Sequence, residues 1–250
     1  MAKRRPPPIG KCVHCLTDNV QRNWDHVFPK SWYPDTTPTN ILKWIIPSCY
    51  KCNKEYGELE QDLLMRLACC VDPKAAATSG IYQKVLRSMD ARHAPNQKEA
   101  RIRIARRNKL LSEMIHGDQI PEDGIYPGLG ERWDRPRNAQ VAMMISANSF
   151  HRLTEKIVRG IFFIEDNQYI ESPYFINFYA LEDEGAAEII TTLARFGKEY
   201  AKGPGILINR AVTPEDGVSA IISIEIWGSF KMYASVMAPL QMNFIRSAVK

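Results

Sequence analysis

Long apolar runs are absent from this chain of 250 residues, and none approaches the ~20 residues that a membrane-spanning helix requires. The basic N-terminus runs directly into Pro6, Pro7 and Pro8 with no apolar stretch behind it, which argues against an ordinary secretory signal. We therefore expect a cytoplasmic protein, in which thiols stay reduced and paired cysteines are more often metal ligands than disulfides. Hydrophobic residues make up 45% of the chain, so a buried core is feasible and disorder is not expected.

The last part of the chain has no net positive charge. Residues 139–250 carry 10 Lys and Arg against 12 Asp and Glu, whereas residues 1–60 carry 9 against 6 and residues 61–138 carry 14 against 10. A polyanion such as nucleic acid is therefore expected to meet the first half of the protein and not the last.

Cysteine is scarce, and four of the six cysteines form two C-x-x-C pairs. The first pair is Cys12 with Cys15 and the second is Cys49 with Cys52. Two such pairs in a reduced compartment predict a tetrahedral Zn²⁺ site. With four sulfur ligands the site would have no open position, so the zinc would be structural. His14 lies inside the first pair and is the alternative ligand to one of the cysteines.

Four polar residues lie between and beside these pairs. Asp25 and His26 form a dipeptide between them, Asn40 lies further along the same segment, and Asn53 directly follows Cys52. In this order the residues from about 11 to 57 resemble the HNH endonuclease family in its zinc-knuckle form. Because Asn53 stands where that family often has histidine, the resemblance is to an H-N-N variant.

The resemblance implies a ββα-metal fold and hydrolysis of phosphodiester bonds in DNA, sometimes in RNA. His26 would be the general base, since a histidine with a pKa near ~6.5 can accept a proton at cellular pH. Asp25 and Asn53 would offer oxygen ligands to a catalytic Mg²⁺ or Mn²⁺, and Asn40 would orient the ring of His26. One difficulty is that consecutive residues on a regular strand, such as Asp25 and His26, point to opposite faces.

Two further groups of residues leave alternatives open. Lys30 and Ser31 follow the dipeptide and would either contact phosphate or cap a turn. A basic helix after Pro95 would either expose a solvated face or grip a nucleic-acid backbone. Its arginines are Arg101, Arg103, Arg106 and Arg107.

The chain divides by pattern into five parts and predicts an α+β protein. Residues 1–10 form a flexible basic arm, residues 11–57 the zinc-knuckle module, residues 58–117 a helical region and residues 118–138 a linker rich in Gly, Pro and charge. Residues 139–250 predict an α+β domain with a mainly antiparallel sheet. Its expected hairpins have turns at Asp166-Asn167 and Gly228-Ser229.

Three functions follow as hypotheses. The first is a metal-dependent endonuclease of the HNH type. The second is a zinc-stabilised module that binds nucleic acid without cutting it. The third is a nuclease effector, as in defence or in phage-associated systems, which residues 139–250 restrain by binding a regulatory ligand or a protein partner.

Overall fold

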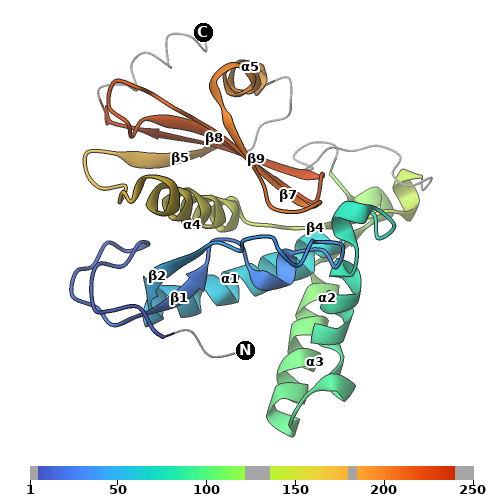
Figure 1. Ribbon diagram of the computed structural model, residues 1–250. Coiled ribbons are helices and arrows are strands. Elements are labelled where there is room, and N and C mark those ends of the chain that lie inside the picture. The colour runs from blue at the N-terminus through green and yellow to red at the C-terminus, as the bar shows by residue number, and fades with distance from the viewer. Residues whose placement is uncertain (1–4, 122–135, 180–184, 240–250) are drawn as a thin grey trace.

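The computed structural model describes residues 5–121, 136–179 and 185–239. It confirms the α+β class, with five α-helices and an antiparallel sheet among these residues (Figure 1). None of the helices in these ranges is long and apolar enough to cross a membrane. Most of the predicted linker, residues 122–135, lies outside the described residues.

A ββα unit opens the fold. Strand β1 (Arg22–His26) pairs antiparallel with β2 (Ile45–Cys49), in a register that sets Arg22 opposite Cys49 and His26 opposite Ile45. Helix α1 (Tyr50–Ala68) follows β2 without a break, and the thiol of Cys49 caps it by accepting from the N–H of Cys52. The second cysteine pair therefore lies at the joint between strand and helix.

The middle region is a helical hairpin that projects away from the rest of the molecule (Figure 1). It consists of α2 (Ile81–Met89) and α3 (Gln97–Ser112), and the side chain of Asn96 caps α3. A short two-stranded ribbon follows, formed by β3 (Met114–His116) and β4 (Val141–Met143). Single 3₁₀ turns occur at Lys30–Trp32, Ala76–Thr78, Ala91–His93, Gly117–Gln119 and Arg137–Ala139.

The last part of the chain is a five-stranded antiparallel sheet with a helix on each side (Figure 1). Helix α4 (Ala147–Asp166) lies between this sheet and the ββα unit, and α5 (Ala187–Phe196) covers the outer face. The strand order is β5-β9-β8-β7-β6. The strands are β5 (Phe175–Tyr179), β6 (Lys198–Ala201), β7 (Ile206–Val212), β8 (Ala220–Ile226) and β9 (Phe230–Met237).

One predicted hairpin is present and the other is wrong. Strands β8 and β9 pair on either side of a turn at Gly228 and Ser229, as expected. The run before Asp166 is the last part of α4, and Asn167 ends that helix with a left-handed φ of 53°. The helix prevails because Ile157, Ile161 and Phe162 continue an apolar stripe with helical spacing, and all three are fully buried.

A single hydrophobic core joins the ββα unit to the sheet. It contains Trp32 from the segment after β1, Ile157 and Ile161 from α4, and Trp227, which directly follows β8. The two indole rings lie 5.5 Å apart, and Nε1 of Trp227 donates to the carbonyl of Trp32 at 2.8 Å. The N-terminal and C-terminal parts therefore bury apolar surface against each other.

Gly160 sets how closely α4 approaches the ββα unit. A Cβ at Gly160 would lie 2.7 Å from Cγ2 of Val27, whereas a Cβ at Gly57 in α1 would meet nothing within 4 Å. We expect Gly160→Ala to lower the free energy of unfolding by about 1–3 kcal/mol through overpacking. The control Gly57→Ala should raise it by about 0.5–1 kcal/mol, because alanine favours a helix interior. Denaturant titrations check both values, and equal effects at the two sites would contradict this packing.

Candidate active site and metal centre

Four cysteine sulfurs converge at one end of the ββα unit. The Sγ atoms of Cys12, Cys15, Cys49 and Cys52 all lie within 4.8 Å of one another. The amide of Cys49 donates to Sγ of Cys12 at 3.3 Å, and the amide of Cys52 donates to Sγ of Cys49 at 3.4 Å. The pair on α1 also benefits from the helix N-terminus, which favours negatively charged thiolates.

This cluster fits a structural metal such as zinc. A hydrogen bond from Cys52, with backbone N–H groups adding to it, lowers the pKa of Cys12 to about 3 against the opposing effect of burial, and the same contact raises the pKa of Cys52. A thiolate among three further sulfurs is the donor set that tetrahedral zinc prefers. His14 is not part of the cluster, so the alternative in which it replaces a cysteine is not supported.

His14 instead holds Asp25. Its Nε2 donates to Oδ2 of Asp25 at 3.0 Å, and its ring packs against Tyr56 of α1 with centroids 4.6 Å apart. The zinc-knuckle loop therefore connects the cysteine cluster to the end of β1 through a buried hydrogen bond.

Asp25 is nearly buried, with 7% of its surface exposed, and both carboxylate oxygens are engaged. Besides His14, it is bound by Lys156 of α4, whose Nζ lies 3.1 Å from Oδ1. The same ammonium pairs with Glu60 of α1, and the Lys156 side chain is fully buried. Burial raises the pKa of Asp25, but the hydrogen bond from His14 and the charge of Lys156 outweigh it, so this pKa is lowered.

Glu60 responds differently to the same surroundings. Burial raises its pKa to about 7, against the opposing effect of Lys156. Desolvation outweighs the ion pair here, so the carboxylate of Glu60 binds a proton more readily than that of Asp25.

His26 lies at the edge of an open cleft of about 720 Å³. Burial is the main cause that lowers its pKa, and the positive charges of Lys156, Lys30 and Lys43 act in the same direction while Asp25 opposes them. Its ring is therefore mainly neutral at pH 7 and able to accept a proton. Nδ1 of the ring is buried and has no hydrogen-bond partner among the described residues.

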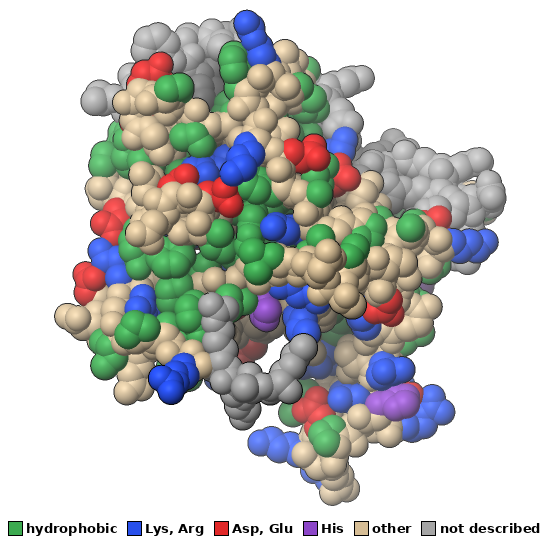
Figure 2. Space-filling view, viewed as in Figure 1, with side chains coloured by type: hydrophobic (Ala, Val, Ile, Leu, Met, Phe, Trp, Pro, Cys, Tyr) green, Lys and Arg blue, Asp and Glu red, His purple; other side chains and the backbone are tan. Residues whose placement is uncertain are grey.

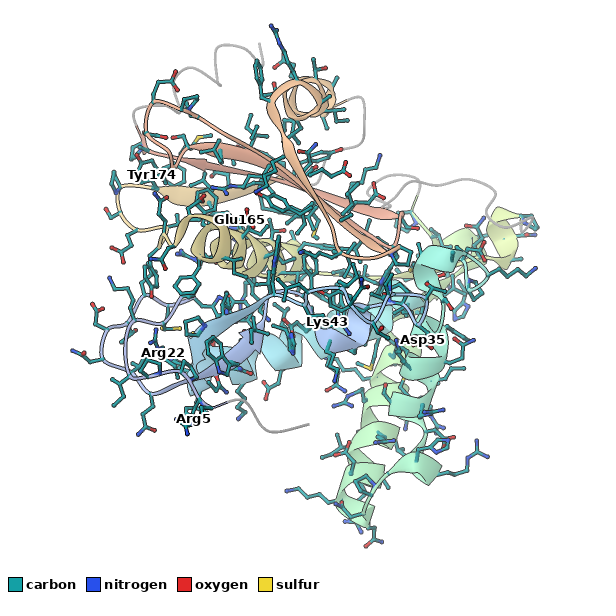
Figure 3. All side chains as sticks on the ribbon, in the orientation of Figure 1. Arg5, Arg22, Asp35, Lys43, Glu165 and Tyr174 are labelled. Atoms are coloured by element: carbon teal, nitrogen blue, oxygen red, sulfur yellow. The ribbon has the colours of Figure 1, made fainter. Side chains whose placement is uncertain are left out.

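The cleft is lined by three lysines and three carboxylates, the latter being Asp25, Asp35 and Glu60. Lys30 and Lys43 come from the segment between β1 and β2, and Lys84 comes from α2. Lys84 pairs with Asp35 at 2.7 Å, whereas Lys30 and Lys43 have no carboxylate partner among the described residues. Figure 3 labels Asp35 and Lys43. Figure 2 shows a hollow in this face in which a histidine and Lys or Arg side chains are visible.

Neither of the two asparagines is among the residues that line the cleft with His26. Nδ2 of Asn53 donates to Oδ1 of Asn23 at 3.0 Å and to the carbonyl of Trp24 at 3.3 Å, so Asn53 ties the first turn of α1 to β1. Asn40 is exposed in the segment between the strands, and its predicted role toward His26 stays a prediction. Ser31 and Lys30 begin a 3₁₀ turn, and both line the cleft.

A catalytic divalent cation on Asp25 and Asn53 does not fit this arrangement. One carboxylate oxygen of Asp25 accepts a hydrogen bond from His14, and the other pairs with Lys156. Nδ2 of Asn53 donates to β1, and Asn53 is not among the residues that line the cleft. Two carboxylates join Asp25 at the cleft: Asp35, which pairs with Lys84, and Glu60, two helical turns after Asn53 on α1.

Sequence reasoning missed Glu60, Lys156, Lys43 and Lys84. The sequence pattern contains a sign of two of these residues, Glu60 and Lys156. Glu60 is seven residues after Asn53, which places both on the same face of a helix. Lys156 lies three residues after Leu153 and four before Gly160, inside a stripe of otherwise small or apolar residues. A lysine in such a stripe has to find a buried partner, but the sequence does not say which.

Comparisons with models of protein families, with curated proteins and with solved structures find no match to this chain. The geometry of the site is therefore the basis for assigning a function.

Proposed function

We propose that this protein is an endonuclease that hydrolyses phosphodiester bonds in nucleic acid, in the first place DNA. The observation that carries the proposal is His26 at the end of β1, in an open cleft that Lys30, Lys43 and Lys84 also line, within a ββα unit that holds four clustered cysteines. The resemblance of residues 11–57 to the zinc-knuckle HNH endonucleases supports the same reading.

The residues have distinct roles in this proposal. His26 takes a proton from the attacking water, and Lys30 and Lys43 neutralise the charge of the bound phosphate. The metal on the four cysteines is structural and keeps β1, β2 and α1 in place. The family resemblance implies products with a 5′-phosphate and a 3′-hydroxyl.

Incubation of the full zinc-loaded chain with circular duplex DNA, single-stranded DNA and RNA tests the proposal, with and without Mg²⁺ or Mn²⁺. We expect nicks or cuts in at least one substrate, with a 5′-phosphate at the new ends. Tight binding with no cleavage of any substrate under any of these conditions would contradict it.

A module that binds nucleic acid without cutting it is the second candidate. Its specific support is the engagement of Asp25 by His14 and Lys156, which leaves the predicted metal ligand occupied. The third hypothesis, a nuclease restrained by residues 139–250, finds support in the same contact, because Lys156 belongs to α4.

If Lys30 and Lys43 contact phosphate, replacing them should change the salt dependence of DNA binding. We expect the double variant Lys30→Ala with Lys43→Ala to bind duplex DNA more weakly. Its slope of log affinity against log salt should be smaller by about 1.8, since each lost phosphate contact removes about 0.9. Fluorescence anisotropy over a series of salt concentrations measures it. Lys198→Ala is the control, because Lys198 is on β6 and does not line the cleft. An unchanged slope in the double variant would remove these lysines from the interface.

A further inference from the structure

The contact between α4 and the active-site carboxylates has no role in the hydrolysis proposed above. Nζ of Lys156 lies between Asp25, at 3.1 Å from Oδ1, and Glu60, with which it forms an ion pair. Both carboxylates line the cleft that contains His26, whereas Lys156 does not and is fully buried. The ammonium therefore approaches the two carboxylates from the side opposite to the cleft.

The packing of α4 against the ββα unit restricts the position of the Lys156 ammonium. Gly160, one turn after Lys156 on α4, lets the helix pack directly against Val27, the second residue after Asp25. The ring of Tyr56 lies 5.6 Å from Nζ and forms a wall of the same buried site. His14 occupies the other oxygen of Asp25, so the carboxylate cannot turn away from Lys156 without losing that hydrogen bond.

A buried carboxylate, Asp25, and a largely buried one, Glu60, need a positive partner, because an uncompensated charge away from solvent is costly. Carboxylate oxygens on neighbouring elements are also the ligands that Mg²⁺ and Mn²⁺ use. An ammonium and a divalent cation would compete for the same oxygen lone pairs, and like charges so close together repel strongly in a low-dielectric site.

We propose that Lys156 is the resident cation of this site. Its ammonium takes the place between Asp25 and Glu60 that a divalent cation would take, and the two carboxylates bind a divalent cation when the ammonium is removed. The carboxylate pair of the site is then Asp25 with Glu60, and Asn53 only fastens α1 to β1. The relevance of this cation site to hydrolysis rests on the proposed function. Its test measures metal binding alone and involves no nucleic acid.

Calorimetric titration with Mn²⁺ on the zinc-loaded full chain tests the proposal. Mn²⁺ is suitable because it prefers oxygen ligands and does not displace zinc from thiolates. We expect Lys156→Met to bind one Mn²⁺ with a Kd at least about tenfold lower than that of the unaltered protein, since the repelling charge is gone. Adding Glu60→Gln to this variant should abolish the gain. The control Lys198→Met removes the exposed partner of Glu165 at the other end of α4 and should leave Mn²⁺ binding unchanged.

If Lys156→Met is too unstable for calorimetry, its melting temperature with and without Mn²⁺ tests the same proposal. A bound cation stabilises the folded state by mass action, so Mn²⁺ should raise the melting temperature of Lys156→Met far more than that of the unaltered protein. Equal Mn²⁺ affinity and equal thermal shifts in the two proteins would overturn the proposal. A gain that persists with Glu60→Gln would overturn the assignment of the pair. Neither result depends on cleavage, so the loss of nuclease activity in other experiments would not be confused with it.

Discussion

Removing the metal from the four cysteines is expected to unfold the ββα unit and to destabilise the rest of the chain with it. Structural zinc binding contributes about 10–16 kcal/mol in small zinc domains, which is as large as the whole stability of a typical protein, about 5–15 kcal/mol. The effect should spread because Trp32, just after β1, belongs to the same core as Trp227, which directly follows β8. Near-ultraviolet circular dichroism during chelation, combined with elemental analysis, measures the loss.

Cysteine variants supply the matched control. Cys52→Ser removes a ligand from the cluster and should reduce the zinc content, while Cys69→Ser changes a half-buried thiol outside the cluster and should leave one zinc per chain. A native protein without zinc, or one that melts at the same temperature after chelation, would contradict a structural metal here.

Replacing His26 is expected to have the largest effect on activity without a comparable effect on stability. General-base catalysis contributes about 10²–10⁴-fold to a rate, so His26→Ala should slow cleavage by that factor. The fold should tolerate the change, because Nδ1 of His26 has no hydrogen-bond partner among the described residues and the ring is only partly buried. Single-turnover cleavage and thermal unfolding of the same preparations separate the two effects.

His93→Ala is the control for this variant. His93 belongs to a 3₁₀ turn between α2 and α3, is exposed and does not line the cleft. Its variant should cut at the unaltered rate. Comparable rates for His26→Ala and His93→Ala would remove His26 from the reaction.

The features predictable from the sequence are those encoded over short distances. The spacing within each cysteine pair predicted the cluster, and the turn at Gly228-Ser229 between two strand-like runs predicted the hairpin of β8 and β9. The hairpin at Asp166-Asn167 was wrong because the same dipeptide also ends a helix. The burial of Ile157, Ile161 and Phe162 on one face of α4 decides between the two structures.

The contacts around Asp25 could not be predicted from the sequence, for a different reason. Lys156 is 131 residues away from Asp25 along the chain, and its position depends on how α4 packs on the ββα unit. Local pattern contains no information about such a pairing. The sequence therefore located the dipeptide of Asp25 and His26 but could not show that α4 supplies a cation to one of them.

Chemical rescue tests the central claim, that the ring of His26 accepts a proton in the cleft. Imidazole is small compared with an open cleft of about 720 Å³, so it can enter the space that His26→Gly leaves. We expect added imidazole to raise the cleavage rate of His26→Gly by about tenfold or more and to have no effect on the unaltered protein. A variant that cuts at the unaltered rate without imidazole, or one that imidazole does not accelerate although it is folded and zinc-loaded, would contradict the account.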